Sequence, residues 1–270
     1  MKFLEQITEK TKCTEGMSPA EVYKCRLGDQ TCYLKTIDSI FSPTTYSVAR
    51  EAQVMNWLKG KLHVPKVLES GLMTENGERA GNAEPERKEA QNCDSPNREY
   101  LLMSELKGRH IDDFADEPLC YVTYLAKAIR ELQSVDISDC PFNADVDMRL
   151  KELDYLLENG LADTDASHWE ETTKFKDPKE LRKWLYDHKP QEEFVFTHGD
   201  VSANMMICED EVYFYDLARC GIADKWMDIA FCVRDIRDYC PDLEETFFRI
   251  LGMKPDYEKI EYYILLDELF

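Results

Sequence analysis

The sequence has no long hydrophobic run, no secretory leader and no basic surplus. None of its apolar stretches approaches the roughly 18 residues that a membrane span needs. Residues 1–13 lack the apolar core of a secretory signal, so we expect a cytoplasmic chain with no membrane partner. Acidic residues outnumber basic ones by 54 to 33, a formal net charge of -21. A nucleic-acid partner would need a basic face and is excluded. A cationic partner fits better, although acidity can also serve solubility alone.

Cysteine pairs of the C-x-x-C type are also absent. The ten cysteines are scattered in mostly apolar contexts, such as the one around Cys232, which favours reduced core thiols over disulfides. Oxidation could still link chains adventitiously, so we expect a monomer or a weak dimer. Of the 270 residues of the chain, 43% are hydrophobic and 32% are charged. Such a chain forms one large domain or two modest lobes.

Two alternating segments near the start predict a β-hairpin. Residues 20–27 and 30–37 have the period of strands, and Gly28-Asp29 between them is typical of a tight turn. Alternation places Tyr33 and Lys35 on the same face of the second strand. An exposed lysine is the ordinary interpretation of Lys35, but the segment that follows offers a partner.

That segment, residues 44–60, predicts a helix with Thr44 or Thr45 as its N-cap. Glu51 lies on its apolar stripe, which comprises Val48, Ala52, Met55 and Leu58. A buried carboxylate needs a partner, since burying it alone is costly, and Lys35 is the obvious candidate. Kinase-like folds hold a lysine against nucleotide phosphates by pairing it with a helix glutamate in this way.

The remaining pattern predicts an α+β, two-lobed fold. Residues 64–73 and 98–108 resemble further strands, and residues 75–97, which lack large apolar side chains, are expected to be a flexible insertion. After residue 108 the period becomes helical; the first apolar stripe comprises Leu119, Val122, Leu125, Ala126, Ile129 and Leu132. We therefore expect a small, mainly β lobe over residues 1–106 and a larger, mainly α lobe over residues 107–270.

The stretch "FVFTHGDVSANMMI" (194–207) places polar residues after a buried segment. Asp200 follows the apolar residues, and a hairpin with a three-residue loop, residues 209–211, would set Asn204 opposite Asp216. An amide and a carboxylate oxygen are ligands that Mg²⁺ accepts together with phosphate and water. Asp200 is then left to orient a hydroxyl group. Capping of turns is the alternative for each of these residues alone.

The chain resembles the Gram-positive type of aminoglycoside 3′-phosphotransferase, within the protein-kinase-like superfamily. The resemblance covers nearly the whole length and rests on "TEGMSPAEVYK", "YLK", "TTYSVARE", "WLKGKLHVPKVL", "LLMSE", "DISDCP", "THGD", "YDLARCGIADKWMDIAFCVR" and "YYILLDELF". The HGD triplet alone is weak, because many small-molecule kinases share it, whereas "ADKWMDIAFCVR" and "LLDELF" are specific. The family activity is transfer of the γ-phosphoryl group of ATP to an aminoglycoside hydroxyl, which confers antibiotic resistance.

The resemblance implies a role for each site residue. ATP, with GTP left open as donor, would be bound by backbone near Met17 and Ser18, by Lys35 held by Glu51, by Tyr33 stacked on adenine, and by backbone from Ser104 to Leu106 at a hinge. Asp200 would be the catalytic aspartate, and Asn204 and Asp216 the Mg²⁺ ligands. The cationic acceptor would meet Asp163, Asp165, Glu170, Asp238, Asp267, Glu268 and the carboxylate of Phe270.

Three departures from the family pattern accompany this resemblance. Asn204 follows Asp200 by four residues, where the family usually has five, and Met205 occupies the fifth position. The insertion at 75–97 is longer than the family's turn, and Ser167 and Tyr239 stand where the close relative has acids. Two alternatives therefore stay open: a degraded kinase fold that binds nucleotide or a polycationic ligand without turnover, and a kinase for another small alcohol such as choline, which would favour an aromatic cage.

Overall fold

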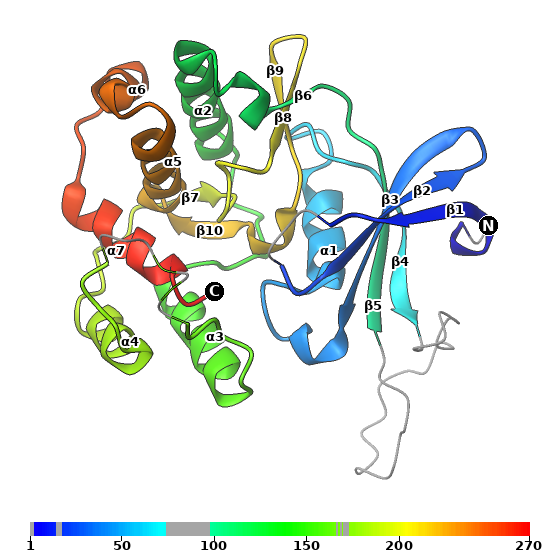
Figure 1. The fold of residues 1–270 in the computed structure, drawn as a ribbon, viewed down its shortest axis with the longest axis horizontal. Coiled ribbons are helices and arrows are strands. Elements are labelled where there is room, and N and C mark those ends of the chain that lie inside the picture. The colour runs from blue at the N-terminus through cyan, green and yellow to red at the C-terminus, as the bar shows by residue number, and fades with distance from the viewer. Residues whose placement is uncertain (1–2, 15–17, 74–97, 166, 168, 170–172) are drawn as a thin grey trace. The chain divides into compact units, whose positions relative to one another are not determined.

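The computed structural model describes residues 3–14, 18–73, 98–165, 167, 169 and 173–270. The chain forms two compact units, shown in Figure 1. The first unit comprises Met1–Leu106 together with Tyr215–Ala218, and the second comprises Lys107–Phe214 and Arg219–Phe270. The predicted lobes, divided at residue 106, put residues 215–218 in the second lobe, whereas in the structure these residues belong to the first unit. The predicted insertion at 75–97 lies outside the described residues.

The first unit is built on a five-stranded antiparallel sheet in the order β1-β2-β3-β5-β4. Its strands are β1 (Ile7–Lys12), β2 (Glu21–Leu27), β3 (Gln30–Asp38), β4 (Val67–Met73) and β5 (Arg98–Ser104). The predicted hairpin is confirmed: Leu27 pairs with Gln30 across the turn, where Gly28 has φ +59°. Short 3₁₀ segments cover Leu4–Gln6 and Ser39–Phe41.

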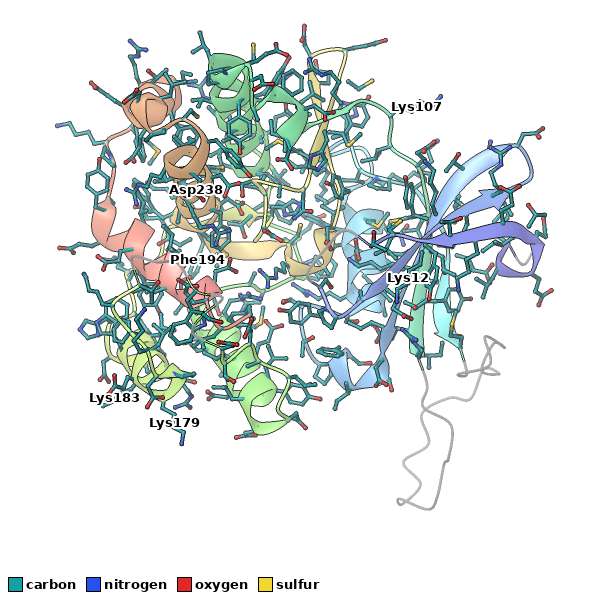
Figure 2. All side chains as sticks on the ribbon, viewed as in Figure 1. Lys12, Lys107, Lys179, Lys183, Phe194 and Asp238 are labelled. Carbon is teal, nitrogen blue, oxygen red and sulfur yellow. The ribbon has the colours of Figure 1, made fainter. Side chains whose placement is uncertain are left out.

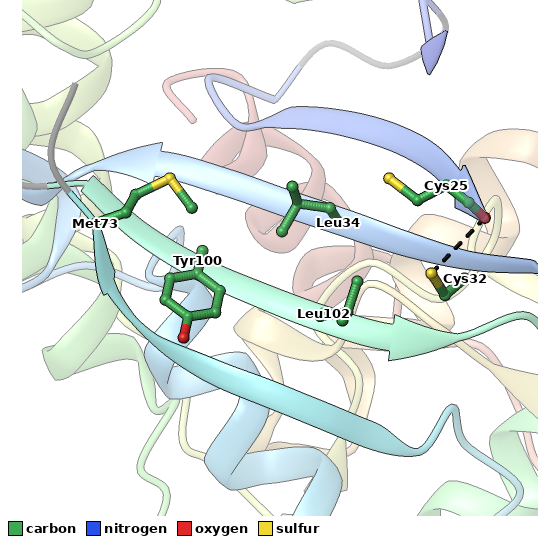
Figure 3. Packing of buried hydrophobic residues seen from close by; sticks show 6 residues of the cluster. All are labelled: Cys25, Cys32, Leu34, Met73, Tyr100 and Leu102. Atoms are coloured by element: carbon green, nitrogen blue, oxygen red, sulfur yellow. Dashed lines mark hydrogen bonds between the residues drawn. The ribbon is translucent and has the colours of Figure 1, made fainter. Parts of the chain in front are cut away.

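One face of this sheet carries an apolar cluster, drawn in Figure 3, which comprises Cys25, Cys32, Leu34, Met73, Tyr100 and Leu102. Cys32 and Leu34 alternate along β3 with Tyr33 and Lys35, as the period of a strand requires. The described cysteines are free thiols, in agreement with the sequence prediction. Lys35 consequently projects from the face of β3 opposite to this cluster.

Helix α1 (Val48–Leu58) also belongs to the first unit. Its predicted apolar stripe is buried, and Glu51 is fully buried with it. The predicted N-cap is wrong: Ser47 accepts the Arg50 N–H, because Thr44 is occupied one turn earlier, where its hydroxyl donates to Phe41 O at 2.7 Å. The helix therefore begins three residues later than a cap at Thr44 would place it.

The second unit is mainly helical. Its helices are α2 (Pro118–Gln133), α3 (Val146–Glu158), α4 (Pro178–Asp187), α5 (Trp226–Tyr239), α6 (Glu244–Leu251) and α7 (Tyr257–Asp267). Two small sheets join β10 (Gly221–Asp224) to β7 (Phe194–Thr197), and β6 (Arg109–His110) to β8 (Met205–Cys208) and β9 (Glu211–Phe214). Further 3₁₀ segments cover Ile111–Phe114, Leu217–Arg219 and Pro241–Leu243. In the helix predicted after residue 108 the apolar stripe is buried, except that Leu119, in its first turn, is exposed.

No helix in the part of the chain that the structure describes is long and apolar enough to cross a membrane.

Candidate active site

A buried group of three charges lies in the first unit. Lys35 Nζ is 2.9 Å from Glu51 Oε2 and 2.5 Å from Asp216 Oδ1. The Lys35 side chain is 6% exposed and that of Glu51 is fully buried, whereas Asp216 is 38% exposed. The predicted pairing of a strand lysine with a helix glutamate is therefore present, and Asp216 joins it from a segment 181 residues away along the chain.

The electrostatics of this group follow from its burial. Burial alone would lower the pKa of the Lys35 ammonium, but the negative charges of Asp216 and Glu51 outweigh it and raise that pKa. Burial raises the pKa of the Glu51 carboxyl, against the opposing effect of Lys35. Glu51 Oε1 also accepts the Leu217 N–H at 3.1 Å, which ties the segment bearing Asp216 to α1. Lys35 is thus held as a fixed cation with one partly exposed carboxylate beside it.

The hairpin that leads to Asp216 differs from the predicted one. β8 and β9 pair Met205 with Phe214 and Cys208 with Glu211, so the loop has two residues, not three. Both loop residues have positive φ, 52° at Glu209 and 64° at Asp210, which is a type I′ turn and matches the twist of the strands.

The shorter loop changes the register at the end of the hairpin. The ladder ends at the pair Met205/Phe214, and its continuation would set Asn204 opposite residue 215. The predicted pairing of Asn204 with Asp216 across the ladder is therefore wrong. Asp216 itself has φ +57°, so the chain turns there rather than extending the strand. The orientation of its carboxylate is set by this turn and by Lys35.

Asp200 lies in the second unit, on the loop between β7 and β8. Just before it, His198 N and Gly199 N donate to the two oxygens of Asp228, at 2.7 and 2.8 Å. Burial raises the pKa of the Asp228 carboxyl, while His198 and these N–H donors act in the opposite direction. Gly199 has φ +81°, and a Cβ there would lie 2.9 Å from Arg219 Cβ. The two residues before Asp200 are therefore held in place, and Asp200 itself is half-buried.

Asn204 closes the same loop. Its Nδ2 donates to Asp200 O at 2.8 Å, and its N–H donates to Val201 O at 3.2 Å. Met205, the residue in the family's usual asparagine position, is fully buried as the first residue of β8. Asn204 is thus the amide of this loop that can offer an oxygen.

Each unit carries one of the two predicted magnesium ligands. In the first unit Asp216 has a partly exposed carboxylate, and in the second unit Asn204 has an amide oxygen; both are hard donors of the kind that Mg²⁺ prefers. Over the described ranges no group of three or more His, Cys, Asp or Glu side chains could hold a metal ion. Phosphate oxygens and water would have to complete the coordination, which is the usual arrangement for Mg²⁺ at a nucleotide.

The residues predicted to bind nucleotide lie in the first unit, except that Met17 lies outside the described residues. Ser18 Oγ accepts the Ala20 N–H at 3.2 Å in the segment before β2. Tyr33 is half-buried on β3, with Lys24 Nζ 5.8 Å from its ring centroid. Ser104 ends β5, and its N–H donates to Lys66 O at 3.0 Å.

Since the Ser104 N–H is engaged with Lys66, a backbone donor to an adenine edge would have to come from the following residues, as far as Leu106. Leu106 is the last residue of the first unit before the chain enters the second unit at Lys107. The predicted backbone contact with adenine is therefore still open, but without the Ser104 N–H as a donor.

The predicted acceptor-binding acids occupy several parts of the second unit. Asp163 Oδ1 accepts the Asp165 N–H at 2.9 Å, and Asp165 Oδ1 accepts the Ser167 N–H at 2.9 Å and its hydroxyl at 2.7 Å. Glu170 lies outside the described residues. Asp238 is exposed near the end of α5, where Figure 2 labels it. These two regions thus present carboxylates that turns and a helix end hold in place.

Asp267, at the end of α7, is placed differently from the predicted contact with the acceptor. Its Oδ1 accepts from Arg219 Nη1 and its Oδ2 from Arg234 Nη1, each at 2.9 Å. Burial by itself would raise the pKa of the Asp267 carboxyl, but the two arginine charges outweigh it and lower that pKa. Both oxygens face arginine, so this carboxylate stabilises the C-terminal segment.

The two residues around the C-terminus remain nearer the surface. Glu268 Oε1 accepts the Thr173 hydroxyl at 2.5 Å, and the Phe270 N–H donates to Asp267 O at 3.0 Å. The Arg149 guanidinium lies 3.9 Å from the Phe270 ring centroid. Both Glu268 and Phe270 are half-buried.

The sequence did not predict the residues that hold the loop before Asp200 and the carboxylate of Asp267. Asp228, Arg219 and Arg234 lie within the block "YDLARCGIADKWMDIAFCVR" but received no role. A signal was present for Asp228: a carboxylate between Met227 and Ile229, in a helix otherwise apolar on that side, must be satisfied by donors elsewhere. No comparable signal distinguishes the two arginines, because their partner comes from α7.

Comparisons with known proteins show what the chain as a whole is similar to. A model described as the phosphotransferase enzyme family matches residues 12–263. An aminoglycoside 3′-phosphotransferase of Campylobacter jejuni is 54% identical over 272 residues, covering 100% of both chains. One from Enterococcus faecalis is 47% identical and covers 99% of this chain and 97% of its own.

Solved structures establish the fold. The crystal structure of an aminoglycoside 3′-phosphotransferase of type VIII has a TM-score of 0.75 at 22% identity, covering 98% of this chain and 94% of its own. An aminoglycoside phosphotransferase of Streptomyces rimosus, solved with ADP and streptomycin, has a TM-score of 0.73 at 21% identity, covering 96% and 91%. The predicted protein-kinase-like fold, with an antiparallel N-terminal sheet and a mainly helical C-terminal part, is confirmed.

Proposed function

This chain belongs to the phosphotransferase enzyme family, and we propose that it transfers the γ-phosphoryl group of ATP to the 3′-hydroxyl of an aminoglycoside antibiotic, conferring resistance. The observation that carries the proposal is the buried group of Lys35, Glu51 and Asp216, because a fixed cation beside a partly exposed carboxylate suits the phosphates of a nucleotide and their metal ion. The full-length relatives, at 54% and 47% identity, support the acceptor class. ATP is available in the cytoplasm, where we place the reaction.

In this proposal the first unit binds the nucleotide. Lys35, held by Glu51, neutralises charge on the α and β phosphates, and Tyr33 offers a ring face to adenine. Ser18, the neighbouring Met17 and the backbone as far as Leu106 supply further hydrogen bonds. Whether GTP replaces ATP depends on that backbone contact, and competition between the two nucleotides measures it.

Mg²⁺, with oxygens of Asp216 and Asn204 as its protein ligands, would neutralise the charge that develops on the transferred group. Asp200 accepts a hydrogen bond from the acceptor hydroxyl, orients its oxygen toward phosphorus and receives its proton. Lys35 keeps the leaving phosphates fixed. Positioning and charge stabilisation supply the catalysis, as the loose transition state of phosphoryl transfer allows.

The acceptor is polycationic, and acids of the second unit suit it. Asp165 and Asp238 are exposed and Asp163 is half-buried; each contributes about 0.2–1 kcal/mol when paired with an exposed ammonium group, so binding arises from the array. Glu268 and the carboxylate of Phe270 complete it. Asp267 contributes by fixing the end of α7 through its two arginines rather than by meeting the acceptor.

Release of ADP from ATP by the purified chain, with and without kanamycin, tests the proposal. Kanamycin-dependent release, together with a phosphorylated product in mass spectrometry, is the expected result. An aminoglycoside that lacks the 3′-hydroxyl should bind without turnover and is the control for regiochemistry. Nucleotide binding without any kanamycin-dependent release would instead support a degraded kinase. Stimulation by choline alone would indicate a kinase for another small alcohol.

A further inference from the structure

Arginine side chains hold the segment that follows α7 in the second unit. Two of them bond the carboxylate of Asp267, the last residue of α7. Three residues further on, the Phe270 ring packs against the guanidinium of Arg149, whose Cζ is 3.9 Å from the ring centroid. Arg149 comes from the first turn of α3, which lies beside the end of the chain in Figure 1. The segment Glu268–Phe270 is thus held at both of its ends.

The Arg149 guanidinium has a fixed direction of its own. Its Nη1 is 2.8 Å from Glu152 Oε2, three residues further along α3, and the two side chains are only 5% and 2% exposed. Because one edge of the planar guanidinium bonds this carboxylate, its flat face can stack on an aromatic ring. Such a contact is stronger when the cation is desolvated, as Arg149 is. The Phe270 ring therefore packs on a rigid, buried support.

The residues of this segment have no helix or strand to place them. They lie beyond the last residue of α7, so their positions depend on side chains of other elements. Leu269 is fully buried, whereas Glu268 and Phe270 are half-buried. In the proposed function these two half-buried residues offer carboxylates to the acceptor. What fixes the Phe270 ring consequently fixes part of the acceptor site.

We propose that Arg149 is a positioning residue for the acceptor, whose guanidinium stacks on the Phe270 ring and thereby fixes the segment that offers carboxylates to an ammonium group of the aminoglycoside. This inference rests on the proposed function and extends it to a buried residue that acts through Phe270. Glu152 acts in turn on Arg149, by fixing the direction of its guanidinium.

The role concerns binding of the acceptor rather than the chemical step. Contacts that are equally strong in the ground state and the transition state change KM and leave kcat as it is. An exposed ion pair contributes about 0.2–1 kcal/mol. Loosening the two contacts of this segment would therefore weaken acceptor binding about 2- to 30-fold.

Four variants separate the stacking from the charge. Arg149→Lys keeps a cation for Glu152 but lacks the flat face. Phe270→Leu keeps an apolar side chain but lacks the ring, and the double variant closes the cycle. Phe270→Tyr keeps the ring and is the conservative variant. If Arg149→Lys fails to fold, Phe270→Leu, a change at a half-buried position, still decides the question.

Arg182→Lys is the matched control. The Arg182 guanidinium lies 4.8 Å from the Tyr186 ring centroid, and its Nε is 2.6 Å from Asp154 Oδ1, so it has the same kind of partners on α4. Four quantities are measured for each chain: the calorimetric affinity for kanamycin with AMP-PNP and Mg²⁺ present, the KM and kcat of kanamycin-dependent ADP release, the affinity for AMP-PNP alone, and the melting temperature.

We expect Arg149→Lys and Phe270→Leu each to weaken kanamycin binding and to raise its KM about 2- to 30-fold. The kcat and the affinity for AMP-PNP should stay within about 2-fold of the unmodified chain. The double variant should be no worse than the more affected single variant, since both lose the same contact. Phe270→Tyr should retain the affinity that Phe270→Leu loses, and Arg182→Lys should match the unmodified chain.

A lower melting temperature with unchanged kanamycin affinity would overturn the inference, because the contact would then serve stability alone. Losses that multiply in the double variant, or an equal loss in Arg182→Lys, would overturn it as well. Kanamycin binding without ADP release by the unmodified chain would refute the proposed function only, since the calorimetric comparison would still decide the role of Arg149. No kanamycin binding by the unmodified chain would overturn both.

Discussion

Replacement of Lys35 by methionine isolates the energetics of the buried charge group. Methionine has about the same length and carries no charge, so it leaves Glu51 fully buried and Asp216 partly exposed without their common cation. Removal of one partner from a buried ion pair costs about 3–5 kcal/mol of unfolding free energy. We expect a loss near the lower figure, because Glu51 keeps the Leu217 N–H at 3.1 Å.

The loss should depend on pH, and its sign follows from Glu51. Burial already raises the pKa of this carboxyl from the ordinary 4.5, with Lys35 opposing the rise. In Lys35→Met that opposition disappears, so the folded state binds a proton more tightly than the unfolded state does. Stability of the variant then falls as pH rises from about 4.5 through the raised folded-state pKa. The difference from the unmodified chain should be small at low pH and complete at high pH.

Urea unfolding at pH 5 and pH 8, with hydrogen exchange over residues 30–58 to report the first unit, measures this difference. Lys24→Met is the matched control: its ammonium group is 3.4 Å from Glu105, but the Lys24 side chain is 55% exposed. An exposed pair contributes about 0–1 kcal/mol. A loss in Lys35→Met no larger than in Lys24→Met, or equal at both pH values, would refute the reasoning.

Three further substitutions test other parts of the site. Asp200→Ala should abolish phosphorylation of kanamycin while the calorimetric affinity for nucleotide stays nearly unchanged, and retained turnover would remove Asp200 from the mechanism. Asn204→Ala should raise the free Mg²⁺ needed for half-maximal ADP release, whereas an unchanged requirement would exclude it as a ligand. Gly199→Ala should lower the free energy of unfolding by about 1–3 kcal/mol, since its Cβ would lie 2.9 Å from Arg219 Cβ at φ +81°; an unchanged melting curve would contradict this.

The elements that the sequence predicts well are those set by local pattern. The two residues Gly28 and Asp29 are enough to predict the tight turn between β2 and β3. The helical period of the segment after Ser47 places Glu51 on the buried face of α1. The pairing of Glu51 with Lys35 then follows from the cost of burying a carboxylate alone. These inferences need no knowledge of distant segments beyond one strand and one helix.

The hairpin before Asp216 could not be predicted in the same way. Glu209 and Asp210 adopt positive φ values that glycine or asparagine usually supplies at such a turn. Their side chains favour neither a two-residue nor a three-residue loop strongly. The choice is made by the ladder and by Phe214, which is fully buried at its end. Because the loop has two residues and not the predicted three, the continuation of the ladder sets Asn204 opposite residue 215 and not opposite Asp216.

The acids of this chain show why net charge alone is a poor guide to the binding site. Asp228 and Asp267 are acidic residues by composition, but backbone N–H groups satisfy the first and two arginines satisfy the second. Asp238, three residues beyond Asp235 on the same helix, remains exposed. Whether a carboxylate holds the fold or remains available to a cation therefore depends on which donors reach it, and most of those donors come from other elements. The surplus of acids favours a cationic acceptor, and the contacts of each side chain decide which acids can meet it.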